Sequence, residues 1–141
     1  MILQLSKVIV GIVVLFVNST LLCAQKPNAE IVDYNLTYTV EGATLLSELN
    51  VGIAVYNSKG EALSSFAFAE NSSSTIPSLN AWVEDLSGNK IKSLDTKLIQ
   101  QTPGSPHATL YPDEKVNLFR LSHNEYPYMI RVKVKRKETE L

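Results

Sequence analysis

Residues 45–57 alternate between apolar and polar side chains. Leucine, valine or isoleucine stands at positions 45, 49, 51, 53 and 55, with Glu48, Asn50 and Gly52 between them, and Ser47 is the one polar residue on the apolar side. A repeat of two residues is typical of a β-strand with one buried face, whereas a helix would scatter these apolar residues around its circumference. Three of them are β-branched, which favours a strand further. The segment therefore predicts a sheet-containing fold.

The neighbouring segments predict further strands. Residues 31–40 alternate in the same way, and the glycine-containing link 41–43 predicts an antiparallel hairpin with residues 45–57. A turn composition follows at 57–60. Beyond it a third strand is expected, which would extend the hairpin to a three-stranded meander; its alternating side chains are Ala62, Ser64, Phe66 and Phe68.

The second half of the chain continues this pattern. Residues 79–83 and 90–94 predict a hairpin through the turn 85–89, with Ile91 as the apolar anchor, after an exposed loop at 70–75. Residues 95–101 suit a short helical turn as well as a strand, and residues 102–107 contain two prolines and a glycine, which predict a loop. Further strands are expected at 116–120 and 128–137, the latter with Ile130, Val132 and Val134 inward. The pattern predicts an all-β antiparallel β-sandwich, with a partly open barrel as the alternative.

The first 24 residues have the layout of a secretory signal peptide. Lys7 precedes an apolar run of ten residues, 8–17, which is short for a membrane span of about 20 residues. Cleavage near Ala24 predicts an exported protein, periplasmic or at the cell surface, with a single domain at 25–141 and no transmembrane span. Cys23 is the only cysteine, and a lipid anchor on it would need a small residue before it, where Leu22 stands.

Composition and motifs argue against several functions. A formal net charge of −1 among 141 residues does not suit a nucleic-acid partner. The sequence contains no nucleophile-elbow, P-loop or dinucleotide motif, and His107 and His123 match no metal-ligand spacing. The neighbouring carboxylates Asp113 and Glu114 would face opposite sides of a strand rather than act as a pair. No catalytic residue, metal site or cofactor is therefore predicted.

Aromatic side chains supply the candidate contact residues. Trp82, Tyr126 and Tyr128 could form a platform for a sugar or a peptide, although aromatic residues in β domains usually lie in the core. Trp82 differs because the alternation places it opposite Leu79, Ala81 and Val83, on the polar side of its strand. These three aromatic residues are the predicted ligand or partner contacts.

Three segments carry a resemblance to a known family. They are Val-Tyr-Asn-Ser-Lys-Gly at 55–60, the pattern A-x-V-x-D-x-x-G-x-x-I at 81–91, and Tyr-Pro-Tyr-Met-Ile at 126–130 before a basic strand. The chain resembles the N-terminal β-rich domain of unknown function that precedes a transglutaminase-like domain in exported bacterial proteins. The resemblance implies a following domain with a Cys-His-Asp set, to which no residue of this sequence corresponds.

These observations favour a non-catalytic exported module. It would be an accessory or binding domain associated with a transglutaminase-like protein, either as a fragment of that protein or standing alone. A freestanding glycan- or peptide-binding module is the alternative, and an enzyme is the least supported function.

Overall fold

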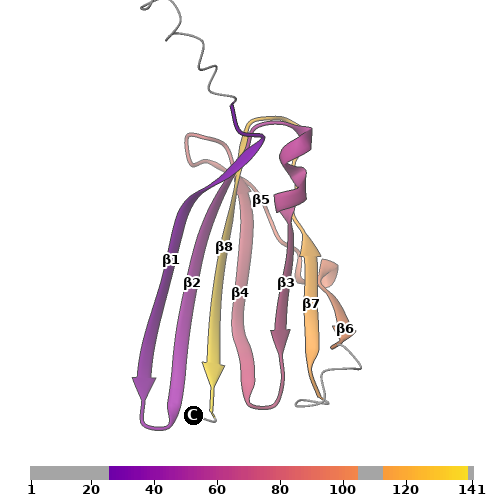
Figure 1. Ribbon diagram of the computed structural model, residues 1–141. Helices are drawn as coiled ribbons and strands as arrows, with labels where there is room; N and C mark the ends of the chain where they lie inside the picture. The colour runs from indigo at the N-terminus through magenta and orange to yellow at the C-terminus, as the bar shows by residue number, and fades with distance from the viewer. Residues whose placement is uncertain (1–25, 105–112, 140–141) are drawn as a thin grey trace, which may run out of the picture.

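The computed structural model of the chain describes residues 26–104 and 113–139 and contains two antiparallel sheets (Figure 1). The larger sheet has the strand order β1(Ala29–Glu41), β2(Thr44–Val55), β8(Tyr128–Glu138), β4(Ser74–Glu84), β5(Lys90–Ser93). The smaller has the order β3(Ser65–Glu70), β7(Lys115–Arg120), β6(Gln100–Pro103). Two short 3-10 helices, η1(Ser58–Ser64) and η2(Thr96–Leu98), complete the described elements. The predicted all-β antiparallel class is confirmed.

The hairpin of β1 and β2 forms one side of the larger sheet. The two strands pair from Ala29 opposite Val55 to Glu41 opposite Thr44, so the connecting turn is Gly42-Ala43. Gly42 has a φ of +62°, a conformation that glycine adopts without strain. The hairpin expected from the sequence is therefore confirmed.

The expected meander is wrong. Residues 58–64 form η1 rather than a strand, because the Asn57 side chain accepts a hydrogen bond from the Lys59 backbone and starts a tight turn. Gly60 then passes so close to Asn28 that a Cβ atom on residue 60 would lie 2.2 Å from the carbonyl oxygen of Asn28. The chain crosses to the smaller sheet as β3, and β8 pairs with the free side of β2 instead, from Leu45 opposite Glu138 to Val55 opposite Tyr128.

The core lies between the two sheets. Phe119 of β7 stacks on Phe66 and Phe68 of β3, with ring centroids 5.1 and 6.2 Å apart. Facing these rings, the central strands contribute apolar side chains that are at most 5% exposed: Ile53, Val55, Ala81, Val83, Ile130, Val132 and Val134. The inward orientation predicted for the last three is confirmed.

The strand β1 lies outside this core. Its alternation predicted a half-buried strand, yet Tyr34, Tyr38 and Val40 are each at least 60% exposed. The smaller sheet packs over β8, β4 and the end of β2, so the apolar face of β1 is left uncovered within the described part of the chain. Ile91, the expected anchor of β5, is also exposed.

Several element boundaries differ from expectation. β4 begins at Ser74, inside the predicted loop, and residues 95–101 contain both alternatives, since η2 is followed by β6. β6 includes Thr102 and Pro103, whereas the rest of the predicted 102–107 loop lies largely outside the described residues. The predicted signal peptide and Cys23 also lie outside them.

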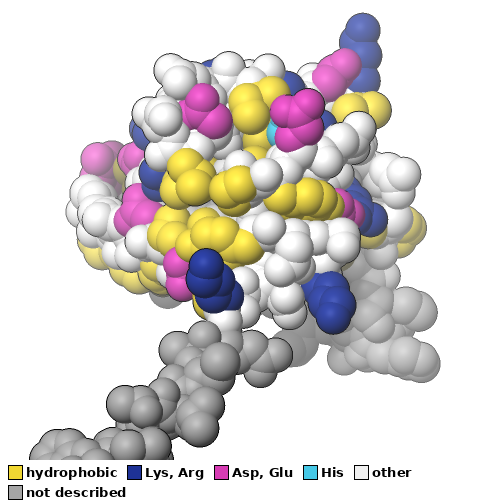
Figure 2. Space-filling view, turned by 90° about the horizontal axis from the view of Figure 1, so that it is seen from above, with side chains coloured by type: hydrophobic (Ala, Val, Ile, Leu, Met, Phe, Trp, Pro, Cys, Tyr) yellow, Lys and Arg dark blue, Asp and Glu magenta, His cyan; other side chains and the backbone are white. Residues whose placement is uncertain are grey.

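Seen from one end of the sandwich, the surface mixes hydrophobic patches with side chains of both charge signs (Figure 2). The residues that the structure describes include no helix long and apolar enough to cross a membrane.

Candidate functional site

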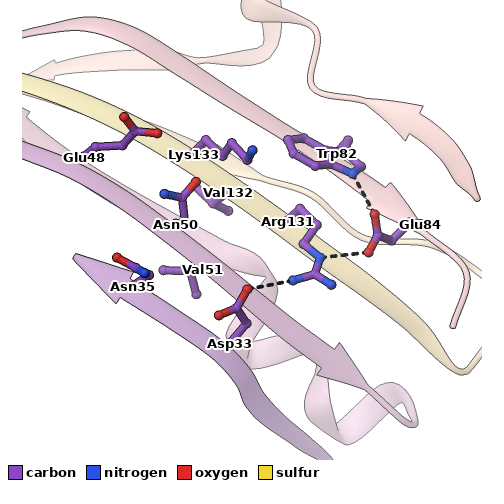
Figure 3. Close-up of a pocket in the computed structure, with 10 residues that line it drawn as sticks. All are labelled: Asp33, Asn35, Glu48, Asn50, Val51, Trp82, Glu84, Arg131, Val132 and Lys133. Carbon is purple, nitrogen blue, oxygen red and sulfur yellow. Dashed lines mark hydrogen bonds and ion pairs between the residues drawn. The ribbon is translucent and has the colours of Figure 1, made fainter. Parts of the chain in front are cut away.

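The outer face of the larger sheet, the face turned away from the core, carries a groove of about 480 Å³ (Figure 3). The groove runs across β1, β2, β8 and β4, so it is built entirely on paired strands. Its lining residues are Asp33, Asn35, Glu48, Asn50, Val51, Trp82, Glu84, Arg131, Val132 and Lys133. Val51 and Val132 are paired residues whose side chains pack on the core side of the sheet, so the other lining side chains are polar apart from the indole ring.

A chain of hydrogen bonds crosses the groove (Figure 3). The indole Nε1 of Trp82 donates to Glu84 Oε2 at 2.9 Å, and Arg131 Nε donates to Glu84 Oε1 at 2.8 Å. Arg131 Nη1 then reaches Asp33 Oδ2 at 3.2 Å. The network joins β4 to β1 across the two strands between them, and it fixes the position of the Trp82 ring.

Gly52 makes room for this network. A Cβ atom at this position of β2 would lie 2.6 Å from Arg131 Nη1 and 3.1 Å from the Asp33 Cβ. The first distance is shorter than real Cβ contacts and the second is tight. The guanidinium can therefore cross β2 to Asp33 because residue 52 has no side chain. The glycine in the alternating segment is thus explained by close packing rather than by an unusual backbone angle.

Glu84 is ionised within the network. Its side chain is 11% exposed, and this burial raises the pKa of the carboxyl group. The hydrogen bonds from Arg131 and Trp82 and the positive charge of Arg131 outweigh burial, so the pKa of Glu84 lies below its ordinary value of 4.5. Glu84 therefore balances the charge of Arg131 at neutral pH.

Trp82 lies on the outer face as the sequence predicted, and two ammonium groups approach its ring. Nζ of Lys90 lies 5.0 Å and Nζ of Lys133 lies 5.7 Å from the ring centroid, both within cation–π range. Both lysines are exposed, so either can move aside for a ligand. Asn35 and Asn50 add amide groups that both donate and accept hydrogen bonds.

Tyr128 does not lie at the surface. It is fully buried, and its hydroxyl lies 3.2 Å from the Ser64 hydroxyl in the core. The prediction of a ligand contact at Tyr128 is therefore wrong, because the inward face of β8 packs against the smaller sheet. The statistical preference of aromatic residues for the core applies to this residue.

Tyr126 is partly buried and lies away from the groove. Its hydroxyl donates a hydrogen bond to Glu61 of η1, which also binds Arg120. The hydrogen bond to Glu61, with burial and the Glu61 charge, raises the pKa of Tyr126 to about 12. The structure thus separates the three predicted aromatic contacts, and only Trp82 belongs to the groove.

His123 and Asp113, which were also considered from the sequence, have structural partners. The His123 ring meets Tyr128 edge to face, and the Asp113 carboxylate accepts a hydrogen bond from the Ser72 backbone. In residues 26–104 and 113–139, no three His, Cys, Asp or Glu side chains are grouped so as to hold a metal ion. His107 lies outside these ranges.

Sequence reasoning missed most of the groove. Asp33, Asn50 and Arg131 are outward residues of β1, β2 and β8, and β8 is far from the hairpin of β1 and β2 in the chain. Only the register, with Asp33 opposite Gly52 and Gly52 opposite Arg131, brings them together. The signal that was available is the glycine at position 52, inside an otherwise regular strand.

The comparisons with known proteins give information about the fold alone. No family model matches the sequence, and no curated protein matches it. The crystal structure of a protein from Parabacteroides distasonis ATCC 8503, described as a "putative protease", is similar with a TM-score of 0.68 at 11% sequence identity. The match covers 81% of this chain and 24% of that chain, so this chain spans about a quarter of the neighbour's length.

Proposed function

We propose that this chain is a non-catalytic, exported module that binds a glycan in the groove on the outer face of its larger sheet. The observation that carries the proposal is a tryptophan ring held beside a row of polar side chains on an open sheet face. An aromatic face can stack on a sugar ring, and the amides, carboxylates and cations beside it can pair with hydroxyl groups.

The position of the groove favours a glycan over an extended peptide. Peptides usually bind β-sheets by pairing with a free strand edge. The groove instead lies on the face of β2, β8 and β4, whose backbone groups pair with neighbouring strands on both sides. A ligand there is recognised by side chains, and the polar side chains of this groove suit a hydroxyl-rich molecule.

A larger protein is the proposed setting of the module. The structural neighbour has this fold in about a quarter of its chain, which supports an accessory role beside other domains. The sequence resemblance names a transglutaminase-like domain as the associated domain. We include that association in the proposal, with the catalytic residues supplied by the other domain.

The test is titration of the purified chain with soluble neutral and acidic oligosaccharides by calorimetry. Trp82 is the only tryptophan, so a change in its fluorescence reports binding at the groove directly. Trp82→Ala is expected to weaken binding at least about tenfold, as loss of a central aromatic contact commonly does.

The control is Tyr34→Ala, which removes an exposed aromatic side chain from the opposite face and should leave binding of a soluble sugar unchanged. Equal losses in both variants would contradict binding in the groove. Absence of binding by the folded protein across the oligosaccharide series would contradict the glycan proposal itself.

A further inference from the structure

The strand β1 forms one edge of the larger sheet and presents an unusual surface. It is 13 residues long, and six of its apolar side chains are 38–65% exposed: Ile31, Val32, Tyr34, Leu36, Tyr38 and Val40. Five of these face the same side as the core, next to the partly buried Leu49 and Val51 of β2. A contiguous apolar surface of this kind on a soluble domain marks an interaction site.

Two of the three other described edge strands, β5 and β6, are protected, and the third, β3, is six residues long, less than half the length of β1. β5 is four residues long and carries Lys90 and Lys92, and β6 is four residues long and ends at Pro103. Short length, lysine and proline are the usual means of preventing edge-to-edge pairing. β1 is long and contains no lysine, arginine or proline. Its backbone edge is therefore suited to pair with another strand.

The sequence of β1 is nearly symmetric about Leu36. Residues 33–39 read Asp-Tyr-Asn-Leu-Thr-Tyr-Thr, so that a tyrosine stands two positions to either side of Leu36 and a polar residue stands next to each tyrosine. When two such strands pair antiparallel about Leu36, Tyr34 of one copy lies opposite Tyr38 of the other. Asp33 lies opposite Thr39, so no like charges face each other within this segment.

We propose that β1 pairs with β1 of a second copy of this chain, antiparallel and centred on Leu36. The two larger sheets then form one continuous sheet of ten strands. Two tyrosine pairs and the leucine pair at the two-fold axis would form the contact, and aromatic pairs across strands stabilise such pairing. An isologous contact of this kind closes as a dimer rather than a filament, because both copies use the same edge and pairing occupies the β1 edge of each.

A charge exchange tests the pairing and its register together. In Tyr34→Lys/Tyr38→Glu, each introduced lysine would lie opposite an introduced glutamate of the other copy, so a dimer is expected. In Tyr34→Lys/Tyr38→Lys, the same positions would place lysine opposite lysine, so a monomer is expected. Both variants remove the same two exposed rings and differ only in the sign of the charge at position 38, which is the charge that would lie opposite the introduced lysine at position 34 of the other copy. The measurement is the mass of the full chain by sedimentation equilibrium, with circular dichroism to confirm folding.

The proposal is supported if the wild type and Tyr34→Lys/Tyr38→Glu are dimers and Tyr34→Lys/Tyr38→Lys is a monomer. A monomeric wild type overturns it, and so do two variants with the same association state, which would place the contact on another surface or with another partner.

Cross-linking provides a second test that does not depend on the stability of the charged variants. In a Cys23→Ser background, Leu36→Cys would place two thiols opposite each other, with Cα atoms about 4.5–5.5 Å apart, within the range for a disulfide. In Val40→Cys the two thiols would lie about 26 Å apart along the strands. Oxidation is expected to cross-link the first variant only. Equal cross-linking of both, or of neither, would contradict the proposed register.

Discussion

Glu84 belongs to the groove network, and its ionised carboxylate also contributes to the stability of the folded protein. Hydrogen bonds from Arg131 and Trp82 hold its pKa below the ordinary value of 4.5 against the effect of burial. A carboxyl group with a lowered pKa in the folded state stabilises the fold above its unfolded pKa, and this contribution is lost as the pH falls through the folded pKa. The groove network is therefore expected to weaken in acid.

We predict that Glu84→Gln lowers the free energy of unfolding at pH 7, because a glutamine has one acceptor oxygen for two donors and carries no charge to balance Arg131. The difference from wild type should shrink as the pH falls from the ordinary carboxyl value of 4.5 through the lower pKa of Glu84 in the folded protein, because the wild-type carboxylate then becomes protonated as well. Urea unfolding of wild type and Glu84→Gln across this pH range measures the difference in their free energies of unfolding. A difference that is independent of pH would mean that Glu84 acts by its shape alone.

At the scale of one element, β8 is the central strand of the larger sheet. Its inward residue Val132 is 1% exposed, whereas its neighbour Lys133 points to the outer face. We predict that Val132→Ala lowers the free energy of unfolding by about 2 to 3 kcal/mol, through lost burial and a residual cavity. Lys133→Ala should change it by less than about 0.5 kcal/mol. Denaturation midpoints for both variants test this, and equal small shifts would show that β8 is not part of the stable core.

Pairing between strands that are distant in the chain is the part of the fold that could not be predicted from the sequence. The alternation in β2 and β8 depends on local burial, so both strands could be predicted from their own residues. Their pairing with each other depends on residues 73 to 93 positions apart, from Val55 with Tyr128 to Leu45 with Glu138. The turn composition at Asn57 fitted a hairpin as well as it fitted η1. The apolar side of β1 could not reveal that it stays exposed, because one strand carries no information about what covers it.

The same limit applies to the candidate site. Trp82 was placed on the correct face, because alternation within β4 settles that question. Tyr128 stands two positions before Ile130, so alternation within β8 already places it on the inward face, where it is buried against the core. The prediction of a ligand contact at Tyr128 did not use that alternation. Arg131 and Asp33 were missed, because their hydrogen bond depends on the register of three strands.

For the molecule as a whole, the two sheets share one core, so we expect them to unfold together. Phe119 belongs to the smaller sheet, is 5% exposed, and packs in one cluster with Ile130 and Val83 of the larger sheet. Phe119→Ala should cost about 3 to 5 kcal/mol, the usual effect of removing a buried phenylalanine. Because the sheets are coupled through this cluster, the loss should appear in the larger sheet as well.

Trp82 makes this coupling measurable, since it is the only tryptophan and lies in the larger sheet. In Phe119→Ala, the transition followed by tryptophan fluorescence should move to lower denaturant together with the transition followed by far-ultraviolet circular dichroism. Leu98→Ala is the control, because this leucine of η2 is 65% exposed and its loss should change stability by less than about 0.5 kcal/mol. If the fluorescence transition stayed at its wild-type midpoint while the dichroism transition split in two, the sheets would be independent units. The smaller sheet would then not be needed to hold the strands that form the groove.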